Sequence, residues 1–150
     1  MALVLRSTPA LVKLGVPFPS PTWYFAEGAT GPFFETFVAL ANPSDQAADV
    51  EGTYLTAEGE RLTKAYVLPP QSRTTLWIDE ETFAGRGKAL ASTDVTMLFA
   101  ARNGVPIVAE QVMWWPGDGA GWRDGHSSPG MVAPASRWVA ADGVDGGPEQ

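Results

Sequence analysis

Cysteine is absent from the 150 residues, and His126 is the single histidine. The lack of cysteine excludes disulfide bonds, thiolate nucleophiles and cysteine-ligated zinc. One histidine without cysteine cannot complete a zinc shell, so no metal site is expected. The adjacent pair His126-Ser127 is not a triad signature, and the chain has no Gly-x-Ser-x-Gly turn. Nor does a phosphate-binding glycine motif precede a helix. We therefore expect no catalytic residues and no cofactor.

Long apolar runs and excess basic charge are also missing. No stretch approaches the ~20 apolar residues that span a bilayer. The run Met1–Leu5 is too short for a signal peptide, so the signal of an exported parent protein is expected outside this sequence. Ten basic residues against seventeen acidic ones give a net charge of −7. Nucleic acid and anionic membranes both attract basic surfaces, so neither is an expected partner, and no membrane insertion is expected.

The sequence is instead rich in turn-forming and β-forming residues. Sixteen glycines and thirteen prolines favour many turns, and a hydrophobic fraction of 45% supports a packed core. Short β-type segments are separated by turn signals such as Asn42-Pro43 and Pro69-Pro70. This spacing predicts an all-β fold: an antiparallel, immunoglobulin-like β-sandwich of about seven short strands. The expected strand segments are 22–27, 33–41, 48–56, 61–68, 72–79, 94–102, 105–115 and 131–141.

Three local expectations accompany this prediction. Asn103-Gly104 is a strong hairpin signal, so it is expected to join segments 94–102 and 105–115 as paired neighbours. Asp79 is the expected N-cap of one helical turn over 79–83. The glycine-rich segment 117–130 is expected to be a long loop.

The C-terminus repeats the N-terminus. In the sequences around Trp23 (P-S-P-T-W-Y-F-A-E-G-A-T-G) and Trp138 (P-A-S-R-W-V-A-A-D-G-V-D-G), a proline, the tryptophan, an alanine and two glycines coincide at one offset of 115 residues, and Glu27 maps onto Asp142. A fixed period indicates an array of similar units. We therefore divide the chain into a proline-rich lead-in (1–21), one repeat unit (22–136) and the start of the next unit or a tail (137–150).

Several sequence blocks in this order resemble a known type of repeat. They are W-Y-F-A-E-G-A-T from Trp23, L-A-N-P from Leu40, L-P-P-Q-S-R from Leu68, P-I-V-A-E from Pro106 and G-H-S from Gly125. The chain is similar to tandem repeats of large secreted or surface proteins of bacteria. That resemblance implies a β-sandwich of unknown biochemical role, located extracellularly or at the cell surface, and it supplies no catalytic residues. The second copy departs from the pattern at Val139, Ala140 and Asp142.

One segment concentrates candidate ligand-binding residues. Aromatic faces stack on sugars and nearby polar groups bind their hydroxyls, so a tryptophan-rich loop is a candidate glycan or protein site. Its simpler interpretation is structural, because adjacent strand residues point to opposite faces and at least one of the paired tryptophans is then core. Two aspartates there do not reach the ligand density of a calcium loop. The candidate residues are Trp114, Trp115, Asp118, Trp122, Arg123, Asp124 and His126.

The repeated tryptophans suggest contact between units. Arg137 and Trp138 belong to a segment that can take, in a neighbouring molecule, the place of the strand containing Trp23. We therefore expect neighbouring repeat units, or self-association through a terminal strand, as partners. The expected function is a non-catalytic structural or interaction module of an exported tandem-repeat protein. A carbohydrate-binding module using the tryptophan-rich loop, and an accessory domain of a polysaccharide-active enzyme, are the alternatives.

Overall fold

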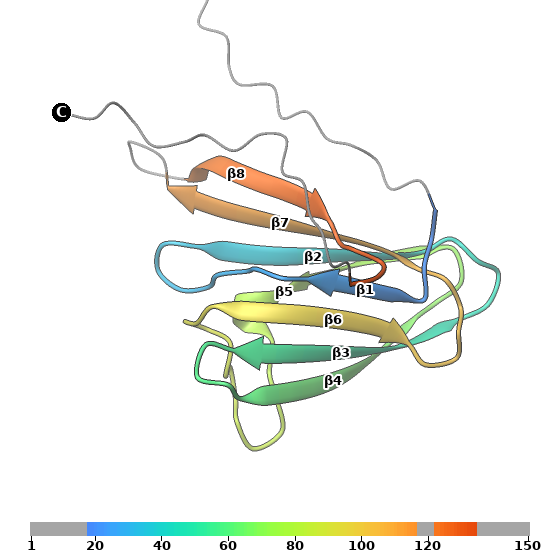
Figure 1. Ribbon diagram of the computed structural model, residues 1–150, viewed down its shortest axis with the longest axis horizontal. Coiled ribbons are helices and arrows are strands. Elements are labelled where there is room, and N and C mark those ends of the chain that lie inside the picture. Colours follow the sequence, from blue (N-terminus) through green and yellow to red (C-terminus); the bar gives the residue numbers. More distant parts are fainter. Residues whose placement is uncertain (1–17, 117–121, 135–150) are drawn as a thin grey trace, which may run out of the picture.

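A computed structural model of the chain shows a sandwich of two antiparallel four-stranded sheets (Figure 1). It describes residues 18–116 and 122–134, and the only helical element in these ranges is the 3₁₀ turn η1 (Ile78–Glu80). One sheet has the order β1-β6-β3-β4 and the other β5-β2-β7-β8. The strands are β1 (Thr22–Phe25), β2 (Glu35–Asn42), β3 (Ala48–Thr56), β4 (Arg61–Leu68), β5 (Ser72–Trp77), β6 (Val95–Ala101), β7 (Val108–Pro116) and β8 (Trp122–Pro129). The all-β sandwich prediction is confirmed, with eight strands in the described part of the chain.

The core lies between the sheets because the strands alternate inward and outward side chains. In β2, Thr36, Val38, Leu40 and Asn42 are buried, while the residues between them are partly exposed. The facing sheet contributes large aromatic side chains that pack edge to face: Phe99 lies 6.2 Å from Phe25 and 5.9 Å from Tyr54, between ring centroids. The largest fully buried side chains include Trp23, Tyr54, Phe99, Leu40, Ile78, Met97 and Ile107.

The likeness to immunoglobulin domains extends to the two-sheet architecture and not to the strand order. In a constant-type immunoglobulin domain the first two strands pair within one sheet. Here β1 pairs with β6, and β2 lies in the opposite sheet between β5 and β7. The chain therefore crosses between the sheets directly after its first strand.

The hairpin prediction for Asn103-Gly104 was wrong. A turn forms there, since Gly104 has φ +75° and donates its N–H to the Ala101 carbonyl at 3.0 Å. However, the strand before the turn, β6, pairs with β1 and β3, whereas β7 pairs with β2 and β8. The Asn103 side chain bonds instead to the backbone of residues 47 and 49 around the start of β3, and the chain then crosses to the opposite sheet. A local turn signal cannot distinguish pairing from a crossing between sheets.

The prediction of a loop over 117–130 was wrong for its second half. Residues 122–129 form β8, which pairs with β7 over a register that includes Met113↔His126 and Gln111↔Ser128. β8 then leads to Met131, whose backbone N–H and C=O exchange hydrogen bonds with Tyr24 at 2.8 and 2.7 Å. The end of the described chain thereby covers the outer edge of β1, which also explains why that short strand is held in place.

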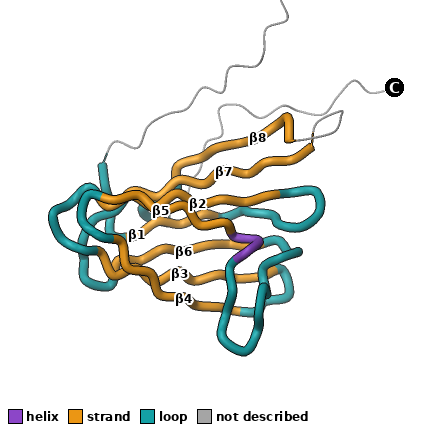
Figure 2. The backbone as a smooth tube through the Cα atoms, turned by 180° about the vertical axis from the view of Figure 1, so that it is seen from behind, coloured by secondary structure: helices purple, strands orange, loops and turns teal. Residues whose placement is uncertain are grey.

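The helical turn expected over 79–83 is a shorter 3₁₀ turn over 78–80, and its expected cap is not a cap. Ile78, not Asp79, begins the 3₁₀ turn that follows β5 (Figure 2). The carboxylate of Asp79 instead accepts the backbone N–H groups of Gly31 and Thr36, each at 3.2 Å. Asp79 therefore fastens the segment that leads into β2. No helix in the described residues has the length and apolar character needed to cross a membrane.

Candidate functional site

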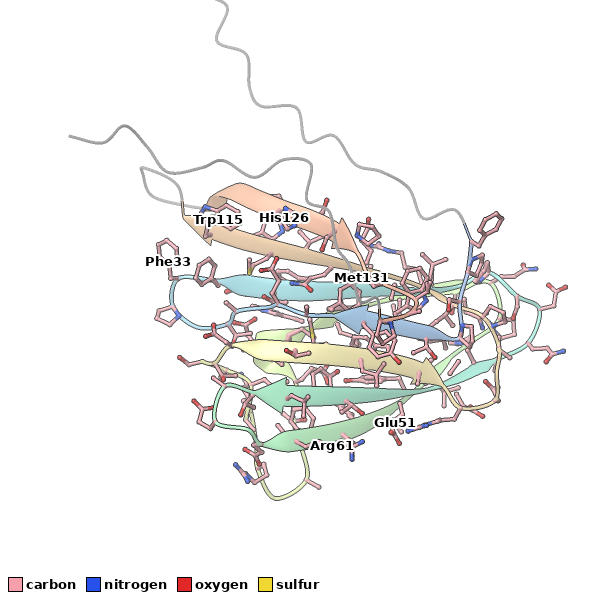
Figure 3. All side chains as sticks on the ribbon, in the orientation of Figure 1. Phe33, Glu51, Arg61, Trp115, His126 and Met131 are labelled. Carbon is pink, nitrogen blue, oxygen red and sulfur yellow. The ribbon has the colours of Figure 1, made fainter. Side chains whose placement is uncertain are left out.

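The structure separates the predicted tryptophan-rich cluster. Trp114 lies on the outer face of its sheet and is 41% exposed. Trp115 is half-buried on the inner face, where its ring lies 6.3 Å from that of Phe34. His126 of β8 (labelled in Figure 3) is opposite Met113, so it shares the face of Met113 and Trp115, and its side chain is exposed. Because Trp114 and His126 point to opposite faces, they do not form one site.

Several predicted site residues have no described side chain. The backbone of β8 includes Trp122, Arg123 and Asp124, whose side chains are not described. Outside the described residues lie Asp118, Arg137 and Trp138. Trp23, the candidate for contact between units, is in the core of its own unit with 1% exposure. Its indole N–H donates to the carbonyls of Ser20 (3.0 Å) and Ile107 (2.8 Å). Trp23 thus holds β1 against the start of β7.

A groove on the outer face of the β5-β2-β7-β8 sheet is the candidate site. Its volume is about 440 Å³, and its lining residues come from three adjacent strands. β2 lies in the middle: Glu35 is opposite Trp114 of β7, and Phe37 is opposite Trp77 of β5. Trp77 and Trp114 are both more than two-fifths exposed, so their aromatic faces are accessible to a ligand.

Packing fixes the aromatic walls of this groove. Trp77 stacks on Phe37 with ring centroids 5.5 Å apart and an interplanar angle of 29°. Trp114 lies closely over Gly125 of β8, where an added Cβ would be 2.7 Å from its Cε3 atom. Only glycine leaves room for the indole at that position. The two exposed tryptophans are therefore positioned by neighbours instead of extending freely into solvent.

Glu35 brings a carboxylate with one unsatisfied oxygen to the groove. Its Oε2 atom is buried and has no hydrogen-bond partner among the described residues. Burial raises the pKa of Glu35, and the negative charges of Asp79 and Glu80 raise it further. A hydrogen bond with the Trp77 side chain lowers it. An acceptor without a donor therefore lies beside an aromatic surface.

Asp79 supports the groove from the end of β5. It is 8% exposed, and burial raises its pKa, while the Thr36 and Gly31 N–H groups that it binds counteract the shift. Through Thr36 it fixes the backbone next to Glu35. Asp79 is therefore a positioning residue for the carboxylate of Glu35.

The sequence analysis did not identify Trp77, Phe37 or Glu35 as a group. In the sequence, the alternation of 72–79 puts Trp77 on the face opposite to Leu76 and Ile78, and Glu35 is an acid in an otherwise apolar segment. The signal that was missing is the pairing of β5 with β2 and of β2 with β7, because only these registers place the three side chains beside Trp114.

Other hollows offer less chemistry. A cleft of about 360 Å³ near the end of β1 includes Glu27 and Asp94 in its lining. A smaller one of about 250 Å³ is lined in part by Tyr24, Gln111 and His126. Within residues 18–116 and 122–134, no group of three or more histidines and acidic residues is arranged to hold a metal ion.

Comparison with known proteins identifies the fold. No family model and no curated protein matches the sequence. The chain is similar to the crystal structure of Thermotoga maritima 1070, with a TM-score of 0.62 and 14% identity, over 75% of this chain and 94% of that one. It is also similar to the Anabaena sensory rhodopsin transducer, with a TM-score of 0.52 and 23% identity, over 63% and 97% of the two chains. The likeness is one of fold alone.

Proposed function

We propose that this chain is a non-catalytic interaction module whose binding surface is the groove formed by Glu35, Phe37, Trp77 and Trp114. The observation that carries the proposal is the pair of exposed but positioned tryptophans on the outer sheet face. Tryptophan is enriched among residues that dominate binding energy. A concave, mainly aromatic surface with one polar group is also typical of ligand sites.

The groove is separate from the residues that stabilise the sandwich. The core consists of inward side chains such as Leu40, Phe99 and Ile107, all fully buried. Trp77 and Trp114 project from the other side of their strands, so their exposed surface contributes no hydrophobic stabilisation to the core. Retaining two large aromatic side chains in water is understandable if a partner covers them.

The module is proposed to be one unit of an exported, tandem-repeat bacterial protein, located extracellularly or at the cell surface. The repeat of the Trp23 region around Trp138 supports this proposal, because Trp23 anchors the first strand of the described unit. A second anchor of the same kind is the expected beginning of another unit. The same segment offers a route to self-association, since it can replace β1 beside β6 in a neighbour. Truncation before Pro134 is expected to abolish any dimer, and a dimer that persists after that truncation would contradict this route.

Binding measurements on the purified protein test the proposed surface. A panel of cell-wall polysaccharides, soluble glycans, peptides and small organic solutes is titrated while tryptophan emission is recorded. At least one class is expected to bind saturably and to lose binding in the double variant Trp77→Ala/Trp114→Ala. Phe33→Ala removes an exposed aromatic side chain outside the groove lining and serves as the matched control. Binding that survives the double variant would exclude the groove as the interaction surface.

A further inference from the structure

We infer that the groove binds a small organic molecule bearing a quaternary ammonium group, with Trp77 and Trp114 on either side of the cation and Glu35 as its counter-charge. This inference rests on the proposed function and specifies the ligand class of the same site. Three features of the groove carry it: the aromatic faces, the Oε2 atom of Glu35 without a hydrogen-bond donor, and the negative charge around the Glu35 carboxylate.

The aromatic lining suits a cation. The face of tryptophan is the best of the aromatic side chains for attracting a cation placed within about 6 Å of the ring. β2 separates β5 from β7, and Trp77 and Trp114 are two residues out of step, so their backbones are about 12 Å apart. The groove between them, with a volume of about 440 Å³, has room for a group of the size of trimethylammonium.

The carboxylate of Glu35 lacks a positive partner within the described chain. Lys64, Lys88, Arg86 and Arg102 pair with other glutamates, namely Glu81, Glu80, Glu60 and Glu51. No lysine or arginine is among the groups that shift the pKa of Glu35. The charges that act on Glu35 are those of Asp79 and Glu80, and both are negative. A cation in the groove therefore gains attraction to Glu35 and relieves the repulsion among these three groups.

This charge pattern distinguishes a cation from a neutral sugar. A sugar hydroxyl can donate a hydrogen bond to Oε2 of Glu35, but it does not offset the negative charge of Asp79 and Glu80. A primary ammonium is strongly hydrated and requires several acceptors, whereas the groove lining provides one acidic side chain and three aromatic ones. A quaternary ammonium needs no such acceptors, and its methyl groups pack on the aromatic faces.

Choline and its uncharged counterpart of the same shape, 3,3-dimethyl-1-butanol, provide the test. Choline is expected to change tryptophan emission saturably, and the neutral molecule is expected to bind about tenfold more weakly. Glu35→Gln keeps the shape of the side chain and removes its charge, so it is expected to weaken choline binding about tenfold. Glu51→Gln removes the same charge from the opposite sheet and is expected to leave binding unchanged. Trp114→Ala is expected to abolish binding.

Other outcomes would overturn the inference and separate it from the proposed function. Equal binding of choline and the neutral counterpart, or an unchanged affinity in Glu35→Gln, would show that charge does not select the ligand. A neutral glycan that binds the same groove, with loss in Trp114→Ala but not in Glu35→Gln, would refute the cation and support the proposed function. The absence of any choline response in the folded parent protein would likewise refute the cation, and the broader panel would then decide the function.

Discussion

Replacement of Trp23 by alanine is the most direct test of how this sandwich is held together. The Trp23 side chain is 1% exposed. It packs closely on Gly130, which follows β8: a Cβ added at Gly130 would be 3.1 Å from the Trp23 ring. A buried aromatic side chain of this size removes 150–250 Å² from water, equivalent to about 4–6 kcal/mol of transfer free energy. Measured substitutions of buried aromatic side chains by alanine cost about 3–5 kcal/mol.

The hydrogen bonds of the indole add little to this cost. The carbonyls of Ser20 and Ile107, which accept the indole N–H, also accept each other's backbone N–H at 3.0 and 2.8 Å. Loss of the indole therefore leaves neither carbonyl without a partner, and we assign about 1 kcal/mol to the lost bond. Trp23→Ala is expected to lower the free energy of unfolding by about 4–5 kcal/mol, and Trp23→Phe by about 1–2 kcal/mol.

Urea denaturation followed by circular dichroism measures these changes. With a slope of about 1.5–2 kcal/mol per M, the alanine variant is expected to lower the midpoint by about 2–3 M. Trp138→Ala is the matched control: if residues 137–150 begin the next unit, its midpoint remains that of the parent chain. A Trp23→Ala midpoint within about 0.5 M of the parent would refute the role of Trp23 in the core. Equal losses in the two variants would instead show that Trp138 belongs to the described unit.

Three further predictions concern single side chains. Gly125→Ala is expected to cost about 1–3 kcal/mol and to shift tryptophan emission to the red, because the new Cβ displaces Trp114; unchanged emission and stability would contradict that packing. Burial raises the pKa of Glu35 in the folded state above its unfolded-state value. Ionisation of Glu35 therefore lowers the free energy of unfolding at pH values above the unfolded-state pKa, and this free energy rises again as pH falls through the folded-state pKa. Glu35→Gln is therefore expected to be more stable than the parent at pH 7, with a gain that vanishes at acidic pH in thermal melts; a gain independent of pH would exclude ionisation as its cause. Tyr66→Phe is expected to cost about 1–3 kcal/mol in chemical denaturation, because the Tyr66 hydroxyl contacts the Tyr54 hydroxyl at 2.6 Å and donates to Glu81 at 2.9 Å; a neutral effect would show that water replaces both bonds.

Much of the secondary structure followed from the sequence alone. The limits of 48–56 and 61–68 were predicted as observed, because alternating apolar residues and the turn at Gly59, with φ +81°, are local properties. The same alternation puts Leu76 and Ile78 on the face opposite to Trp77, and in the structure the first two are buried and Trp77 is exposed. The period of two in a strand needs no knowledge of the neighbouring strand.

The pairing of strands was not available from such local patterns. Asn103-Gly104 forms its turn whether the next strand pairs with the preceding one or crosses to the other sheet. Asp79 appeared as a cap because its distant partners, Gly31 and Thr36, come close only in the folded chain. The segment after Gly121 resembled a loop because it contains Gly125. A glycine is required there only because Trp114 of the adjacent strand lies directly over it.

The sequence by itself determined the fold class, the limits of strands 48–56 and 61–68 and the alternation of side chains between the two faces of a strand, because composition, alternation and turn chemistry are local. The tertiary structure alone decided which strands are neighbours. It placed Trp23 in the core, separated Trp114 from His126, and joined Trp114 to Glu35, Phe37 and Trp77. These contacts depend on registers between segments that are far apart in the chain, and a register is fixed by the packing of the whole core.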